Sequence, residues 1–352
     1  MIYFYILSFF VILGLVRKNS KLVFVCLVST LFFLVTHFNA GNDLINLEST
    51  YDMSIPNTDY FEKSFLFSLF LLYIKDLGGS FLVFRIICFI LWATAVLTVI
   101  WKYSKYPTFV VACCTFFPLL AFGAQIRNGV AVSFVYWAIF FLLTKENVYG
   151  KLIFLCFVFL GGLIHSSVFI YAIGIFVTIK VNYKTLLILC LIISIASIFM
   201  IQSGLLSLLV SITIGDYYSE KYFTGIDGFD HHHLFLYPGI LFNLFLSVNY
   251  RNRIFRNIDT VEHKYVRFSD FVMRFNIIML IALPLMIISL SFYRVYQYMF
   301  ILTVILLTIA CHFCNNRYRG QIDMLLYMCF YFCVTFYYHL WQGEFLTGFK
   351  SI

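Results

Sequence analysis

Charged residues are scarce in this chain of 352 residues, where Asp, Glu, Lys and Arg together make up 11%. A soluble domain carries roughly 25% charged residues, which keep its surface hydrated. The chain therefore lacks the polar surface of a secreted domain, a nucleic-acid-binding module or a soluble enzyme.

Several familiar sequence signals are also missing. The first charge is Arg17, so no basic segment precedes the first apolar run and no cleavable signal peptide is predicted. The chain has no Walker glycine loop, no His-Glu-x-x-His motif and no Gly-x-Ser-x-Gly motif. Its ten cysteines lie within apolar runs or at their ends, so we expect buried thiols rather than disulfides. The pair at Cys311 and Cys314 has metal-like spacing, but no second pair completes a site, and we predict neither metal nor cofactor.

Apolar sequence is what the chain has in abundance, with 62% hydrophobic residues and a mean hydropathy of +0.94. A crossing takes about 20 apolar residues, and backbone polar groups in lipid must be satisfied within the segment, as in a helix. The sequence therefore predicts an all-α, polytopic integral membrane protein that forms a single multi-pass domain over residues 1–352. About twelve transmembrane helices are predicted, at 2–16, 22–38, 81–101, 107–123, 128–143, 151–165, 166–180, 185–201, 234–248, 271–291, 295–313 and 323–340.

Two further apolar segments, 65–74 and 204–214, are too short to cross. We expect each to form a re-entrant or interfacial helix. Two prolines, Pro118 and Pro284, lie within predicted spans, where each is expected to kink the helix.

The distribution of positive charge predicts the orientation. With the N-terminus outside, the inner loops carry 16 of the 24 Lys and Arg residues, and the outer segments carry six together with eleven acids. The positive-inside rule favours this orientation, with both ends outside. It requires residues 151–180 to form two short spans that turn at His165. One long span would invert everything downstream unless 204–214 also crossed.

The two longest outer loops are predicted at 39–64 and 202–233, and both are acidic and rich in aromatic residues. Aromatic rings that stack on sugars, beside carboxylates that accept hydroxyl hydrogen bonds, are typical of a carbohydrate surface. Solvated connecting loops have the same composition, so both readings stay open. The second loop also carries three successive histidines at 231–233, to which we assign no metal.

A few charges interrupt the apolar sequence, where ionisable groups are costly and mark a ligand path or an internal pair. Arg127, Arg294 and His165 fall at outer turns, and Arg85 lies about 6 Å inside a span that starts at the same side. Each arginine alone suits snorkelling to headgroups. Together they predict a cationic cluster, since the guanidinium fork fits phosphate oxygens. Arg274 lies near the inner face, where we expect it to snorkel.

Three short stretches follow one another in a characteristic order. Residues 125–131 read Gln-Ile-Arg-Asn-Gly-Val-Ala, residues 162–167 read Gly-Leu-Ile-His-Ser-Ser, and residues 293–298 read Tyr-Arg-Val-Tyr-Gln-Tyr. They resemble the Gln-x-Arg-x-x-x-Ala, His-x-Ser and Arg-x-x-x-Tyr elements of the Wzy/EpsG-type polysaccharide polymerases of bacterial envelopes. Asp43, in the acidic first outer loop, has the place of an acidic residue expected from that family.

The resemblance implies a multi-pass glycosyltransferase of the bacterial inner membrane. Such enzymes join undecaprenyl-diphosphate-linked oligosaccharide repeat units on the outer face, in O-antigen, capsule or exopolysaccharide biosynthesis. A sugar hydroxyl attacks an anomeric carbon, and the lipid diphosphate leaves. The implied catalytic residues are Arg127, His165, Arg294 and Asp43, and the implied substrate-binding residues are Gln125, Arg85, Tyr51, Tyr293 and Tyr298.

That chemistry needs cations for the departing diphosphate, which Arg127 and Arg294, with Arg85, would supply. It also needs a base for the attacking hydroxyl. His165 is the first candidate because an unshifted histidine is largely neutral near pH 7, and Asp43 is the second.

Three other functions stay open at this point. A flippase for the same lipid-linked unit would need cations in both leaflets and at the midplane. A ligase that moves finished polymer would carry one larger outer loop, and a membrane acyltransferase would pair its histidine with an acid. The expected partners are the lipid-linked oligosaccharide, membrane lipid, a flippase and a chain-length regulator, with no nucleic acid.

Overall fold

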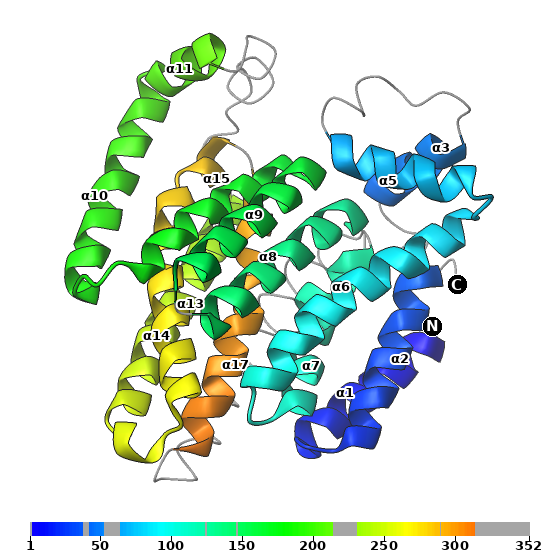
Figure 1. Cartoon of the computed structure of the whole chain (residues 1–352), viewed down its shortest axis with the longest axis horizontal. Helices are drawn as coiled ribbons and strands as arrows, with labels where there is room; N and C mark the ends of the chain where they lie inside the picture. Colours follow the sequence, from blue (N-terminus) through cyan, green and yellow to red (C-terminus); the bar gives the residue numbers. More distant parts are fainter. Residues whose placement is uncertain are drawn as a thin grey trace.

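The structure is a computed structural model that describes residues 2–37, 42–52, 64–123, 125–145, 147–213, 231–288 and 290–313. Every regular element in these ranges is a helix, which confirms the predicted all-α class (Figure 1).

The elements of the described ranges, in chain order, are α1 (Ile2–Val16), α2 (Lys21–His37), α3 (Asn42–Asp52), α5 (Phe65–Asp76), α6 (Phe81–Tyr103), α7 (Pro107–Cys114), the π-helix η1 (Thr115–Leu119), the 3-10 helix η2 (Leu120–Gly123), α8 (Ile126–Thr144), α9 (Val148–Ile164), the 3-10 helix η3 (Ser166–Thr178), α10 (Tyr183–Gln202), α11 (Leu205–Thr213), α13 (His231–Phe255), the 3-10 helix η4 (Ile258–Thr260), α14 (His263–Met279), the 3-10 helix η5 (Leu280–Ala282), α15 (Leu285–Ile288), the 3-10 helix η6 (Leu290–Tyr293), α16 (Arg294–Gln297) and α17 (Met299–His312).

Four helical stretches are long and apolar enough to cross a membrane: α6, α8, α10 and the stretch Arg294–His312. Apolar helices of 10–17 residues add Tyr5–Val16, Lys21–His37, Val148–Ile164 and Ser166–Thr178. These helices indicate a membrane protein. The count of about twelve crossings remains a prediction, and the span predicted at 323–340 lies outside the described residues.

The predicted turn at His165 is confirmed, because α9 ends at Ile164 and η3 begins at Ser166. The second arm is a 3-10 helix rather than the α-helix expected from its composition. A 3-10 helix rises about 2.0 Å per residue, so these 13 residues cover about 26 Å instead of about 20 Å. This longer rise lets a short segment reach most of the way across a hydrocarbon core of about 30 Å.

The stretch after α14 departs most from its prediction. Residues 271–291 were expected to form one span, but α14 ends at Met279, and short 3-10 and α-helical pieces follow as far as Gln297. Pro284 lies within this break and Pro118 within the π-helix η1, so both predicted interruptions are confirmed.

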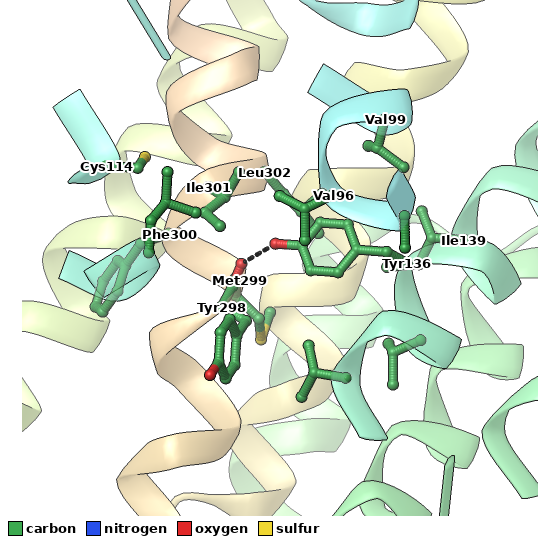
Figure 2. Packing of buried hydrophobic residues seen from close by; sticks show 14 of the residues in the cluster. Val96, Val99, Cys114, Tyr136, Ile139, Tyr298, Met299, Phe300, Ile301 and Leu302 are labelled. Carbon is green, nitrogen blue, oxygen red and sulfur yellow. Dashed lines mark hydrogen bonds between the residues drawn. The ribbon is translucent and has the colours of Figure 1, made fainter. Parts of the chain in front are cut away.

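Side-chain hydroxyls bond to the carbonyls of this broken stretch. Five hydroxyls donate to backbone carbonyls from Met279 to Tyr298, the residue after this stretch: Tyr296 to Met279 at 2.7 Å, Ser194 to Leu280 at 2.8 Å, Tyr237 to Leu283 at 3.2 Å, Tyr171 to Val295 at 2.5 Å and Tyr136 to Tyr298 at 2.7 Å. Figure 2 shows the last of these bonds within the packed apolar core. Backbone carbonyls that leave a regular helix at membrane depth need such partners.

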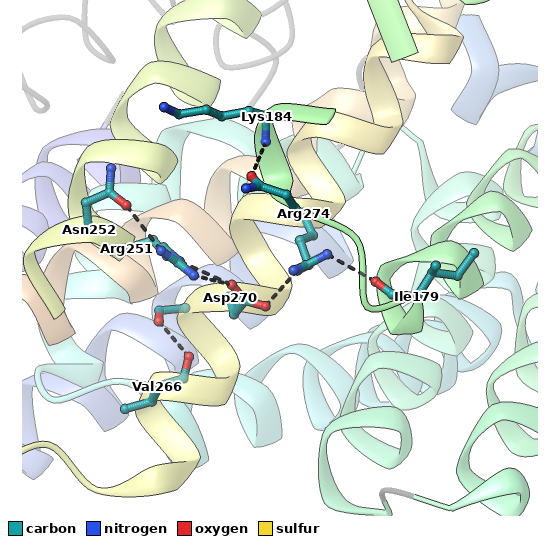
Figure 3. A network of polar contacts seen from close by, with 9 residues as sticks. Ile179, Lys184, Arg251, Asn252, Val266, Asp270 and Arg274 are labelled. Atoms are coloured by element: carbon teal, nitrogen blue, oxygen red, sulfur yellow. Dashed lines mark hydrogen bonds and ion pairs between the residues drawn. The ribbon is translucent and has the colours of Figure 1, made fainter. Parts of the chain in front are cut away.

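Other expectations also need correction. The outer loop predicted at 39–64 contains the helix α3, which packs beside α5 (Figure 1). Arg274 does not snorkel alone, since its Nε donates to Asp270 at 2.7 Å (Figure 3). The seven described cysteines are all free thiols, as expected, but Cys156 is exposed on α9 rather than buried.

Gly161 allows α9 to approach α8 closely. A Cβ at this position would lie 2.8 Å from the carbonyl oxygen of Ala131 on α8 and 2.9 Å from Val168 Cγ1. We expect Gly161→Leu to lower the stability of the purified protein in detergent by about 1–3 kcal/mol, because it overpacks this contact. Thermal unfolding measures the loss. Cys156→Leu, at an exposed position of the same helix, is the control, and an equal effect of both changes would contradict this account.

Candidate active site

The first and third motifs meet at one end of the helix bundle. Gln125 stands at the N-cap of α8, and its Oε1 accepts hydrogen bonds from Gln297 Nε2 at 3.2 Å and from Asn128 Nδ2 at 3.5 Å. Gln297 and Asn128 are both buried. The amide of Gln125 therefore links the start of α8 to α16, which carries Arg294 at its first position.

Arg127 lies in the first turn of α8 and is half-buried. Its Nη1 donates to Ser64 Oγ at 2.9 Å, and Ser64 is the buried residue that directly precedes α5. This bond holds the short apolar helix α5 against the site. A guanidinium has five N–H donors in a planar fork, and its charge persists when it is partly buried.

His165 occupies the turn between α9 and η3, close to both arginines. Its Nδ1 accepts a hydrogen bond from the backbone N–H of Ser167 at 3.4 Å and lies 2.8 Å from Ser167 Oγ. Because Nδ1 is an acceptor here, the neutral ring carries its proton on Nε2. Burial, and then the positive charges of Arg127 and Arg294, lower the pKa of His165 to about 3. The ring is therefore neutral at physiological pH.

The predicted tyrosines have buried rings. Tyr293 packs with its ring centroid 6.4 Å from that of Phe300, and the carbonyl of Tyr298 is the acceptor for Tyr136. These contacts fix the segment that positions Arg294. The substrate-binding role of Tyr293 and Tyr298 remains a prediction.

Arg85 and Tyr51 stabilise a neighbouring part of the fold. Arg85 is buried in α6, where its Nη2 donates to the carbonyl of Val35 on α2. The hydroxyl of Tyr51 on α3 donates to the carbonyl of Gly79 at 2.6 Å. Both side chains tie secondary-structure elements together, and their predicted contact with substrate is still a prediction. Asp43 belongs to the first turn of α3, and its side chain lies outside the described part of the structure.

Two residues of the site were not predicted from the sequence. Ser64 is 63 positions before its partner Arg127, and no motif marks it. Gln297 lies within the Arg-x-x-x-Tyr stretch, so that motif does contain the signal, although only the structure shows its bond to Gln125. Among the described residues, no group of three His, Cys, Asp or Glu side chains is placed to hold a metal ion.

The fold and the site define a helical membrane protein that presents two guanidinium groups and a neutral histidine at one end of its bundle. The EpsG family matches residues 20–350, so the chain belongs to this family of Wzy/EpsG-type polysaccharide polymerase-like proteins. No curated protein and no solved structure matches the chain. Membership of the family indicates a role in polysaccharide biosynthesis.

The lowered pKa of His165 predicts a pH dependence of stability. As pH falls below 6.5, the unfolded chain binds a proton on this ring, whereas the folded protein does so only near pH 3. Folding should therefore lose up to about 1.4 kcal/mol per pH unit between these values, with no effect above pH 6.5. Thermal unfolding from pH 7 to 4.5 should show a shallower acid loss in His165→Gln than in wild type. Parallel curves for the two proteins would contradict the prediction.

Proposed function

We propose that this protein is a membrane glycosyltransferase that polymerises undecaprenyl-diphosphate-linked oligosaccharide repeat units on the outer face of the bacterial inner membrane. The observation that carries the proposal is the bond from Gln297 to Gln125, which brings the segments of Arg127 and Arg294 together at the end of the bundle predicted to face outward, where His165 also lies. The product would be O-antigen, capsule or exopolysaccharide. A flippase that supplies the lipid-linked units and a chain-length regulator are the proposed partners.

The proposed reaction exchanges one bond at an anomeric carbon. A hydroxyl oxygen of one repeat unit forms a bond to the anomeric carbon of another, and the bond from that carbon to the diphosphate oxygen breaks. The bonding electrons leave with the undecaprenyl diphosphate, and the hydroxyl proton passes to a base. Arg127 and Arg294 would stabilise the negative charge that develops on the diphosphate, at a site where the local dielectric is low.

The sequence suggested that His165 acts as the base, but its geometry suits a hydrogen-bond donor to the leaving group better. Its Nδ1 already accepts from Ser167, so the ring offers an Nε2–H donor. A neutral donor between two guanidinium groups would add a third hydrogen bond to the leaving diphosphate. This leaves Asp43, the other predicted base, to take the hydroxyl proton.

A flippase for the same lipid is the second candidate, and a ligase for finished polymer is the third. Both would recognise a lipid diphosphate, and family membership favours polymerisation. Polysaccharide analysis distinguishes all three.

The proposal predicts that both arginines are needed for chain growth. In cells that lack this gene, polysaccharide should stop at one repeat unit, and wild type should restore long chains. Arg127→Ala and Arg294→Ala should each lower polymer by about 100-fold, the usual cost of removing one donor that stabilises transition-state charge. Gel separation of polysaccharide by length measures this.

Arg256→Ala is the matched control, because Arg256 is exposed and lies after α13, away from the site. It should restore normal chains. Repeat units trapped on lipid at the cytoplasmic face would indicate a flippase, and long unattached polymer would indicate a ligase. Normal chains in the deletion strain would contradict all three functions.

The role of His165 predicts a difference between two amide substitutions. The side-chain amide of Gln places an N–H near the position of Nε2, whereas that of Asn reaches only as far as Nδ1. We expect His165→Gln to retain at least tenfold more polymer than His165→Asn in the same cells. Equal loss in both, matching His165→Ala, would instead support His165 as the base. Protein amounts are compared by immunoblot.

A further inference from the structure

A second concentration of positive charge lies at the other end of the bundle. The ends of α8, α9, η3, α13 and α14 enclose a cavity of about 480 Å³. The Lys and Arg residues that line it are Lys145, Lys151, Lys180 and Arg267. Lys145 directly follows α8, whose 19 residues separate it from the Arg127 end by about 27 Å. The cavity is therefore distinct from the candidate active site.

The one carboxylate among the described lining residues is already neutralised. Asp270 lies 3.0 Å from Arg251 Nη2 and 2.7 Å from Arg274 Nε, as Figure 3 shows. In the described part of the chain, the three lysines of the cavity have no ion-pair partner. Glu146, which follows Lys145 in the sequence, lies outside the described residues. The described lining thus has a positive charge that its own carboxylate does not balance.

Two helices, α9 and α14, with 17 residues each, also begin at the cavity. Asn147 Oδ1 caps α9, and Glu262, which precedes α14, pairs with Lys105 and Lys264. The start of a helix carries a partial positive charge and favours anions. Arg267, in the second turn of α14, donates from Nη2 to the carbonyl of Leu142 at 2.8 Å, which fixes its guanidinium at the wall. The positive-inside rule predicts basic residues in the inner loops, but it does not require these residues to line one cavity.

The start of α9, beside the lining residues Asn147 and Lys151, carries apolar side chains that face outward, here called the rim. Val148 and Tyr149 in the first turn of α9 are each 68% exposed, and Leu152 one turn later is 54% exposed. In a membrane protein such side chains at the end of a helix contact lipid. A ligand with a phosphate group in the cavity and acyl chains against this rim would satisfy both surfaces.

We propose that this cavity binds the phosphate group of an anionic phospholipid at the inner leaflet. The recognition chemistry is that of lysines, an arginine and helix N-termini around a phosphate, so a soluble phosphate compound is the alternative source of the same group. The site does not depend on the proposed polymerase reaction.

Native mass spectrometry of the full-length protein in detergent tests the proposal. Delipidated protein is titrated with phosphatidylglycerol, with phosphatidylcholine and, separately, with inorganic phosphate. We expect phosphatidylglycerol to bind at least tenfold more tightly than phosphatidylcholine, and the triple variant Lys145→Gln, Lys151→Gln, Lys180→Gln to lose that preference. The triple variant Lys18→Gln, Lys21→Gln, Lys102→Gln is the control, since it removes equal charge from inner loops outside the cavity.

The outcomes separate the sources of the phosphate. Loss of phosphatidylglycerol binding in the cavity variant alone supports the lipid site. Inorganic phosphate that displaces the bound lipid at millimolar concentration supports the same pocket with a soluble ligand. Equal loss in both triple variants, or in neither, would overturn the proposal. Size-exclusion profiles and thermal unfolding verify that each variant is folded.

Discussion

The side-chain hydrogen bonds that hold the broken stretch between Met279 and Tyr298 are the constraint on which the candidate site depends. Between Met279 and Tyr298 the chain leaves the α-helical pattern, and each buried carbonyl without a partner would cost several kcal/mol in apolar surroundings. Hydroxyls from α8, η3, α10, α13 and α16 donate to five backbone carbonyls of this stretch, two of which, those of Leu280 and Leu283, also accept a backbone N–H. The broken stretch positions Arg294, so the site rests on the packing of tyrosines and a serine around it. This dependence also gives a physical use to some of the 25 tyrosines in an otherwise apolar chain.

Composition was enough to predict where most helices lie, because a run of apolar residues in lipid has to be helical. The boundaries of α1, α2 and α6 fall within two residues of those predicted. The kind of helix was not predictable in this way. The 3-10 geometry of η3 and the hydrogen bonds from distant side chains to the stretch after Met279 are not contained in hydropathy. In the sequence itself, only Pro118 and Pro284 indicated that a helix would be interrupted.

The charged residues of the candidate site could be predicted from the sequence, but the residues that hydrogen-bond to them could not. Arg127, Arg294 and His165 stand out in sequence because charge is costly in apolar runs. The structure adds Ser64, which is remote in sequence, and the amide bridge of Gln125 to Gln297. It also gives the tautomer of His165, since Nδ1 accepts from the backbone N–H of Ser167, and this supports the donor role proposed above. Neutrality suits this position, because a third positive charge beside two guanidinium groups would add repulsion.

The separation of the two cationic regions bears on the choice between catalysis and transport. A diphosphate that moved between them would need cations or water along its path, because an ion in apolar surroundings carries a large desolvation cost. In the described chain, the middle of the bundle is instead closed by buried side chains, with every residue of α17 from Met299 to Ala310 buried. The hydroxyls of Tyr136 and Tyr171 donate hydrogen bonds to backbone carbonyls within this region. This arrangement supports the proposal of a reaction at the end that holds Arg127 and Arg294 over transport of a diphosphate through the bundle.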